Sequence, residues 1–256
     1  MKRPRWILDL HPDFPGSAAV AARVPSPVLV TQEDAVLGRF PPVELPAVGY
    51  GTMRTMMQLM RTPSLANAVF DDYPALRCAS YYRAIYDLLG RTCVLVPFTA
   101  LALLPLEKMF GSAFFVRPDT NYKLFPATIL TAATLGPWVQ AYAHHADELV
   151  VVSEVVTFIS EYRCFCRNGS FVCGSSYPAQ PYAPVPDEVR SFAEQVAARL
   201  MDRGLTMVTV DVGVGQGRMR VVEVGGVNNW GIYGADVDAF ITMMEAEALA
   251  RVEDLA

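Results

Sequence analysis

Short apolar segments separated by turn residues divide the first hundred residues into alternating strands and helices. The apolar runs predict three strands, at 6–10, 28–30 and 93–96. Stretches rich in helix-forming residues predict helices at 52–61 and 80–89, and Gly90 ends the second. Strands that alternate with helices in this way are typical of a small α/β unit.

From residue 113 onward the pattern changes to strands that pair as hairpins. Strands are predicted at 114–116, 149–153, 157–166, 170–177, 206–212 and 219–224. Asn168-Gly169, between two of these strands, is a strong signal for a two-residue hairpin turn. Helices are predicted at 187–203 and from Asp236 onward. The chain therefore combines an α/β segment with an α+β segment.

Composition narrows the class of protein. With 52% hydrophobic and 18% charged residues, the chain can bury a large core, which excludes disorder for most of its length. The longest apolar run, 93–106, contains two prolines and is too short to span a membrane. A formal net charge of −5 argues against binding to nucleic-acid phosphates. We therefore expect a cytoplasmic protein that binds neither membranes nor nucleic acids, and five cysteines without a Cys-x-x-Cys spacing agree with this.

The glycine-rich stretch 211–217 resembles a dinucleotide-binding fingerprint, but a predicted strand follows it where that fingerprint requires a helix. We interpret it as a hairpin turn centred near Gly217. Such a turn places Asp211 opposite Glu223, within a register step or two. Facing carboxylates repel, and a shared Mg²⁺ ion would relieve the repulsion, with Asn228 as a further oxygen ligand. The alternative is a pair of exposed carboxylates without a ligand.

Positively charged side chains in apolar surroundings are candidates for phosphate contacts. Glu161 and Arg163 share one face of a predicted strand, where Arg163 either pairs with Glu161 or holds a phosphate. Arg117 ends another strand. Lysine occurs only three times, and Lys123 lies in an apolar stretch, where the alternative is a solvated amine on an apolar stem. The turn at 49–51 either offers N–H groups to an anion or is an ordinary strand-to-helix turn.

Five blocks of the sequence resemble, in order and spacing, those of the ATP-grasp superfamily. They are FFVRPDTNYKLF (114–125), VVVSEVV (150–156), EYRCFCRNGSFVCGSSY (161–177), TVDVG (209–213) and VVEVGGVNNWGIYGAD (221–236). The region from 106 to 250 looks most like a compact bacterial and phage clade of this superfamily. The resemblance implies an ATP-grasp fold of mixed α+β and α/β class, in which two subdomains of antiparallel sheet and helix clasp ATP. It divides the chain into an N-terminal α/β segment, 1–105, and an ATP-grasp domain, 106–256.

The resemblance also implies roles for individual residues. Arg117 and Lys123 match phosphate-contacting cations, and Arg163 matches a residue beside the transferred phosphate, so these three are the implied catalytic residues. Lys108 is either a second phosphate lysine or a surface residue. The implied nucleotide-binding set comprises Lys108, Arg117, Lys123, Glu154, Val155, Val156, Glu161 and Arg163.

The resemblance assigns Mg²⁺ to Asp211 and Glu223 and leaves the third ligand open between Asn228 and Asn229. Many family members carry a Glu-x-Asn sequence, which here would need asparagine at position 225. The chain has Gly225 at that position.

The family's usual chemistry implies an ATP- and Mg²⁺-dependent ligase. Such an enzyme phosphorylates a carboxylate to an acyl phosphate, which an amine or another nucleophile then attacks. Two alternatives remain: a kinase-like phosphotransferase, and a non-catalytic nucleotide-binding module, which Gly225 favours. The expected partner is a small-molecule or peptide substrate, and a homodimer is left open.

Overall fold

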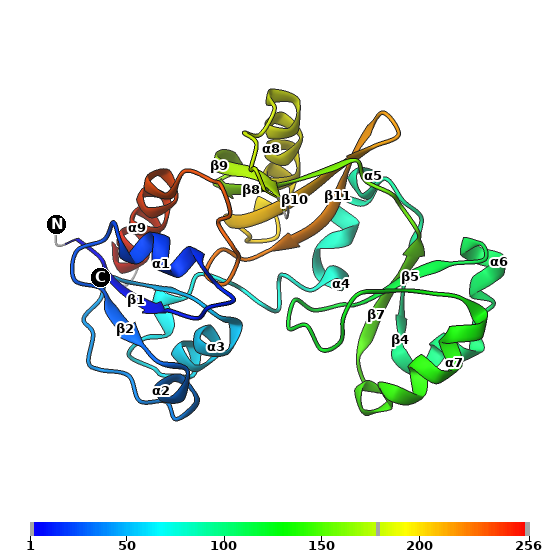
Figure 1. Cartoon of the computed structure of the whole chain (residues 1–256), viewed down its shortest axis with the longest axis horizontal. Helices are drawn as coiled ribbons and strands as arrows, with labels where there is room; N and C mark the ends of the chain where they lie inside the picture. The colour runs from blue at the N-terminus through cyan, green and yellow to red at the C-terminus, as the bar shows by residue number, and fades with distance from the viewer. Residues whose placement is uncertain (1–2, 178–179, 254–256) are drawn as a thin grey trace.

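The structure is a computed structural model that describes residues 3–177 and 180–253. Its described strands form three sheets, which lie side by side along the molecule (Figure 1). The chain runs from an N-terminal unit to a sheet at the opposite end, which we call the distal sheet. It then returns through a sheet in the middle, which we call the central sheet. This mixed α+β architecture agrees with the predicted fold class.

The N-terminal unit is a parallel sheet with helices on both faces. Its strands are β1 (Arg5–Asp9), β2 (Val28–Val30) and β3 (Ala47–Tyr50), in the order β2-β1-β3. Its helices are α1 (Gly16–Ala21), α2 (Gln32–Val36), α3 (Met53–Arg61) and the 3₁₀ turn η1 (Ala66–Ala68). Since side chains alternate along a strand, Trp6 and Leu8 face a core shared with α1 and α9 (Val237–Glu253), whereas Ile7 faces α2 and α3. The last helix therefore covers the first sheet.

The distal sheet is antiparallel, in the order β4-β7-β5-β6. Its strands are β4 (Cys93–Pro97), β5 (Phe114–Pro118), β6 (Thr128–Leu130) and β7 (Leu149–Glu154). One face packs on α6 (Leu106–Phe110), α7 (Ala132–Ala141) and the 3₁₀ segments η3 (Phe98–Leu103) and η4 (Ala143–His145). The first strand of this sheet, β4, precedes residue 105, where we expected the domain boundary, and it pairs with β7, which follows residue 105. A boundary at residue 105 would therefore divide the sheet.

The central sheet consists of two hairpins in the order β11-β10-β8-β9. The strands are β8 (Ser160–Arg167), β9 (Ser170–Tyr177), β10 (Met207–Gly215) and β11 (Arg218–Gly225), and α8 (Asp187–Met201) covers one face. The two turns have positive φ at both central residues: 49° and 78° at Asn168-Gly169, and 53° and 69° at Gln216-Gly217. Such turns match the twist of paired strands, so both hairpins form where the sequence predicts them.

The helix predicted at 80–89 is broken into three short pieces. They are α4 (Cys78–Tyr81), η2 (Tyr82–Ala84) and α5 (Tyr86–Leu89), and Gly90 ends the last with a φ of 60°. Tyr81, Tyr82 and Ile85 are all buried in the core that these pieces share with the central sheet. Within the part of the chain that the structure describes, no helix is long and apolar enough to cross a membrane.

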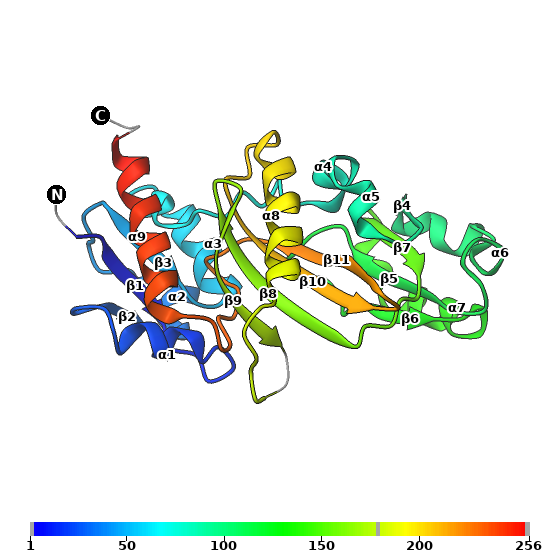
Figure 2. The same cartoon turned by 90° about the horizontal axis from the view of Figure 1, so that it is seen from above.

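The loop that follows β11 is tied to the N-terminal unit by two buried side chains, Asn228 and Asp71, which we call the latch. The Asn228 amide donates to the carbonyls of Gly49 at 2.6 Å and Ala68 at 3.3 Å, and its oxygen accepts from the Phe70 N–H at 2.7 Å. The Asp71 carboxylate accepts from the backbone N–H groups of Val227 and Asn228. The latch therefore sets where the central sheet meets the first sheet (Figure 2).

The latch makes the stability of the protein depend on pH. Burial raises the pKa of Asp71 to about 6, despite two N–H donors that lower it. A carboxyl group with a higher pKa in the folded state holds its proton more tightly there, so stability falls as pH rises from about 4 to 6, by about 3 kcal/mol. We expect Asp71→Asn to remove this part of the pH dependence, as measured by urea unfolding at several pH values. Asp72→Asn, at an exposed neighbour, is the control. Equal pH slopes in wild type and Asp71→Asn would contradict this account.

Candidate active site

Several side chains implied to act on ATP meet on one face of the central sheet. Asp211 of β10 is the direct partner of Glu223 on β11 and of Arg163 on β8. Partners in an antiparallel sheet project to the same side, so these three side chains share a face. The observed register confirms the predicted position of Asp211 opposite Glu223.

Arg163 and Asp211 form a buried, two-point ion pair. Arg163 Nε lies 2.9 Å from Asp211 Oδ1 and Nη2 lies 2.7 Å from Oδ2, and only 9% and 1% of the two side chains are exposed. Forked contacts of this kind fix the orientation of a guanidinium more firmly than a single hydrogen bond. Burial raises the pKa of Asp211, and the Arg163 charge opposes that rise.

Glu161 does not take Arg163 as its hydrogen-bond partner. Its Oε2 lies 3.0 Å from the Tyr177 hydroxyl, which lies equally close to Asp211 Oδ2. One hydroxyl proton serves one of the two carboxylates at a time. Burial raises the pKa of Glu161, the Tyr177 hydrogen bond opposes this, and the Asp211 charge adds to it. The raised pKa makes it easier for Glu161 to hold a proton of its own at this contact.

Three aromatic rings surround the Arg163 guanidinium. Its carbon lies 4.5 Å from the ring centre of Trp230, 4.7 Å from Tyr177 and 5.0 Å from Tyr233. The Tyr177 and Tyr233 rings stack 5.4 Å apart, and Tyr233 is held at a φ of 52°, which bulky residues rarely adopt. A guanidinium held between rings and a carboxylate has little freedom, which suits a group that must meet a ligand in one orientation.

A second arginine connects the distal sheet to the central sheet. Arg117, on β5, donates to Glu223 Oε1 at 2.6 Å and to Asn121 Oδ1 at 3.2 Å. The Asn121 amide in turn donates to the Val224 carbonyl on β11. The Arg117 side chain is 7% exposed and that of Glu223 is 29% exposed, so the pair lies at the edge of the space between the sheets. Each carboxylate implied to bind metal therefore carries one arginine.

The two lysines implied to contact phosphate are both exposed. Lys123 lies in the connection between β5 and β6, shortly after Asn121, at a φ of 51°. Phe125 enters the core behind the distal sheet, whereas the Lys123 side chain is exposed, so its amine is accessible to solvent and to a bound ligand alike. Lys108 lies on α6, on the sheet face opposite to Arg117, where it fits the role of a surface residue.

The nucleoside-binding linker implied by the sequence joins the two sheets. Glu154 ends β7 and its Oε1 accepts from the Thr92 N–H at 2.7 Å, and Val155 and Val156 follow. The Phe158 ring lies against Gly213 of β10, where an added Cβ would come within 2.3 Å of it. Val155 is 39% exposed, so the start of the linker is open to a ligand while its end is anchored.

Asn228 does not fit the metal-binding role. Both atoms of its amide bind backbone groups in the latch, and the side chain is 0% exposed. Asn229 donates to the Met53 sulfur at 3.3 Å, and among the described residues its buried Oδ1 has no hydrogen-bond partner. Nowhere in residues 3–177 and 180–253 do three His, Cys, Asp or Glu side chains gather closely enough to hold a metal ion.

The turn at 49–51 is an ordinary strand-to-helix turn. Asp9, at the end of β1, accepts hydrogen bonds from the Thr52 N–H and from the hydroxyls of Thr52 and Thr55, and Gln32 also donates to it. A carboxylate of the chain itself thus occupies the N-terminus of α3. The anion-binding alternative has no support here.

Comparison with known proteins identifies the family. The model of the ATP-grasp domain, R2K clade family 2, matches residues 88–243, which is more than half of the chain. The chain belongs to the ATP-grasp superfamily. A search of curated proteins finds no match.

Solved ATP-grasp ligases share the fold of this protein. The D-alanine–D-alanine ligase of Bacillus anthracis, complexed with ATP, is 11% identical, with a TM-score of 0.64 and full coverage of both chains. D-cycloserine synthetase DcsG is 13% identical, with a TM-score of 0.62 over 96% of this chain and 99% of that chain. The ligase PsnB, complexed with precursor peptide PsnA2 and AMPPNP, is 13% identical, with a TM-score of 0.56 over 97% of this chain and 99% of that chain. At such identities the likeness establishes the fold.

In this ATP-grasp protein the match begins after the N-terminal sheet, so Asp71 and the carbonyls that hold Asn228 lie outside it. Sequence reasoning missed four residues of the site: Asn121, Tyr177, Trp230 and Tyr233. Tyr177 lies on the hairpin partner of the Arg163 strand, and a register shift between Phe165 and Cys166 places it opposite Glu161, which counting from the turn does not predict. The other three, Asn121, Trp230 and Tyr233, lie in loops and gave no periodic signal.

Replacing each carboxylate by its amide distinguishes what the two ion pairs contribute to the free energy of unfolding. We expect Asp211→Asn to lower the free energy of unfolding by about 3–5 kcal/mol, because it leaves the buried Arg163 charge without a partner. Glu223→Gln keeps an oxygen for Arg117 at a partly exposed site, so we expect a loss of only about 1 kcal/mol. Urea unfolding of both variants measures the difference, and equal losses would show that the Arg163–Asp211 pair is not the more buried constraint.

Proposed function

We propose that this protein is an ATP- and Mg²⁺-dependent ligase that activates a carboxylate as an acyl phosphate for attack by an amine or another nucleophile. One observation carries the proposal: two facing carboxylates on the central sheet are each paired with an arginine, and one of these arginines, Arg117, comes from the distal sheet. Phosphoryl transfer needs positive charge and fixed geometry more than it needs acid–base groups. The family membership and the ligase neighbours support the same chemistry.

The residues divide into those that hold the nucleotide and those that hold the reacting group. The linker residues Glu154, Val155 and Val156 would bind the nucleoside, in the open part of the linker. Arg117 would bind the phosphates, and in doing so it would release Glu223 Oε1. Arg163, fixed by Asp211 and its three rings, would orient the transferred phosphate and the acceptor carboxylate.

Asp211 and Glu223 are the residues that would hold Mg²⁺. Mg²⁺ is commonly bound through one or two carboxylates together with substrate phosphates, and it supplies charge neutralisation for the transferred group. The facing positions of the two side chains and the partial exposure of Glu223 fit this role. Asn228 is excluded from it by its contacts in the latch.

The acceptor is proposed to be a small molecule or a peptide. It would lie between the loop 228–233 and the carboxyl ends of the parallel strands, where Asn229 meets Met53 at the start of α3. Ligands of open parallel sheets bind at this edge. PsnB is a ligase with a bound precursor peptide and the D-alanine ligase joins amino acids by name, so both acceptor classes occur among proteins of this fold.

One observation favours a second candidate, a non-catalytic nucleotide-binding module. Gly225 removes one side chain from the face that carries Glu223, and an arginine already pairs with each of the two carboxylates. A screen of ATP consumption against pooled amino acids, peptides and small acids separates the candidates. A ligase forms ADP only with its acceptor, and hydroxylamine traps the acyl phosphate as a hydroxamate. A kinase-like enzyme leaves a phosphorylated product, and a binding module forms no product.

Binding of nucleotide should raise the melting temperature. At a Mg·ATP concentration about 100 times the Kd, linkage adds about 2.7 kcal/mol of stability, which corresponds to a shift of roughly 5–10 °C for a chain of this size. Thermal unfolding monitored with and without Mg·ATP measures the shift. No shift at saturating nucleotide would contradict both the ligase and the binding-module proposals.

The two exposed lysines provide a matched test of the phosphate site. We expect Lys123→Ala to weaken Mg·ATP binding about 10- to 100-fold, as the loss of a charge-assisted contact predicts, without changing the melting temperature of the free protein. Lys108→Ala, on the opposite face of the distal sheet, should leave binding unchanged. Calorimetric titration measures both, and equal effects of the two substitutions would remove Lys123 from the site.

A further inference from the structure

The Trp230 ring fills the space beside Glu223 on the active face of the central sheet. Gly225 lies two residues after Glu223 on β11, so both positions face the same side. A Cβ added at Gly225 would come within 1.8 Å of Trp230 Cζ2 and 2.0 Å of Cε2. These distances are far below any real contact, so the indole lies directly on the Gly225 backbone. No side chain can stand at position 225 while Trp230 keeps this place.

Trp230 is held in this position from three sides. Its own carbonyl accepts a hydrogen bond from the buried Tyr50 hydroxyl at 2.9 Å, which fixes the backbone to the N-terminal sheet. Its ring carries the Arg163 guanidinium 4.5 Å from its centre, and the residue is 8% exposed. The ring is therefore packed between Gly225 and Arg163, and moving it would disturb both the latch region and the ion pair with Asp211.

The remaining oxygen atoms on this face are few. Both oxygens of Asp211 accept hydrogen bonds from Arg163, and one also contacts Tyr177. Thr209, which is paired with Gly225 across the sheet, is buried and donates its hydroxyl to the Gly226 carbonyl. Glu223 is partly exposed, at 29%, and so is Glu161, whose Oε2 accepts from the Tyr177 hydroxyl. A cation here would take few ligands from the protein and the rest from phosphate and water.

We propose that this site admits a single divalent cation, held through Glu223 and Asp211, because Trp230 occupies the place from which a third protein ligand would reach a second ion. The inference rests on the proposed binding of Mg·ATP. It assigns Trp230 two tasks: the ring positions Arg163, and its volume limits the site to one ion.

The number of bound ions can be counted directly with Mn²⁺, which replaces Mg²⁺ at oxygen-ligand sites and is visible by electron paramagnetic resonance. Wild-type protein is titrated with Mn²⁺ in the presence of a non-hydrolysable ATP analogue, and calorimetry measures binding of the analogue separately. We expect one tightly bound Mn²⁺ per chain in the complex. Two tightly bound ions would overturn the inference and leave the proposed function intact, whereas failure of the analogue to bind would overturn the proposed function and the inference with it.

A double substitution tests the part that Trp230 plays. Trp230→Ala combined with Gly225→Asn clears the ring and places an amide oxygen two residues from Glu223, so we expect the count to rise from one ion to two. Trp230→Ala alone is the matched control: it opens the space without adding a ligand, and the count should stay at one. A double variant that is folded by circular dichroism and still binds one ion would overturn the role of Trp230. Should the double variant fail to fold, the count for the wild-type protein decides the proposal.

Discussion

The buried pairing of Arg163 with Asp211 is the constraint on which the site depends. A guanidinium and a carboxylate can be taken out of water only if each satisfies the other, and here the fork of Arg163 meets both oxygens of Asp211. Once this pair is fixed, the rings of Tyr177, Trp230 and Tyr233 have a defined cation to pack on. The loop 228–233 then closes over one side of the guanidinium, and the Gly231 carbonyl lies 3.4 Å from its Nη1. The aromatic packing, the ion pair and the conformation of the loop 228–233 therefore all depend on the position of the Arg163 guanidinium.

The N-terminal unit builds the loop that completes this centre. The Asn228 side chain makes three hydrogen bonds, to backbone groups of Gly49, Ala68 and Phe70, and the Tyr50 hydroxyl donates to the Trp230 carbonyl. None of these four partners lies within the matched ATP-grasp region, which starts at residue 88. A segment that reads in the sequence as a separate α/β unit is thus part of the machinery that orients Arg163.

Local patterns in the sequence predict part of the site, and distant contacts decide the rest. The register of Asp211 and Glu223 follows from a two-residue turn and strand alternation, both of which are local. The role of Asn228 could not be found in this way, because its amide partners lie 158 to 179 residues away. For Lys123, the apolar neighbours suggested a phosphate contact, and the structure shows an exposed side chain on a left-handed backbone, while Phe125 enters the core. The helix expected at 80–89 forms as three short pieces, which the local pattern did not indicate.

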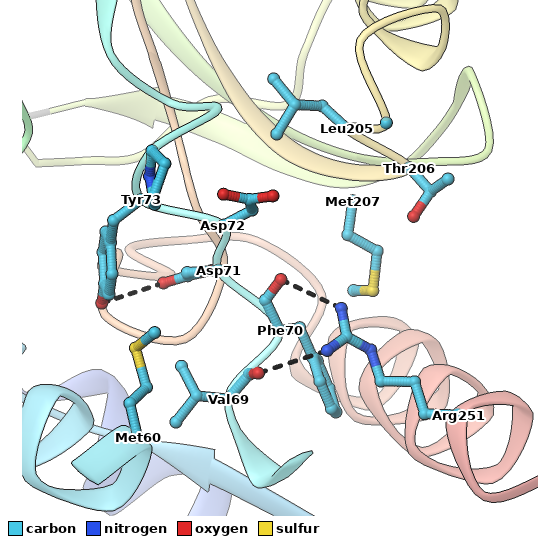
Figure 3. Close-up of a pocket in the computed structure, with 12 residues that line it drawn as sticks. Met60, Val69, Phe70, Asp71, Asp72, Tyr73, Leu205, Thr206, Met207 and Arg251 are labelled. Carbon is cyan, nitrogen blue, oxygen red and sulfur yellow. Dashed lines mark hydrogen bonds between the residues drawn. The ribbon is translucent and has the colours of Figure 1, made fainter. Parts of the chain in front are cut away.

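The return of α9 to the first sheet has a consequence for synthesis of the chain. One face of the first sheet packs on α9, which begins at Val237, through Trp6, Leu8, Val48 and Tyr50. This face can therefore be buried only after α9 has been synthesised. Until then one face of the nascent sheet stays apolar and open, a surface on which chaperones act and aggregation begins. Because β1 and α9 lie at the same end of the molecule (Figures 1 and 2), a circular permutant that links α9 to β1 would make them neighbours in sequence and shorten that interval. Arg251 of this late helix binds the carbonyls of Val69 and Phe70 at an open groove of about 330 Å³, which the segments 69–74 and 204–207 also line (Figure 3).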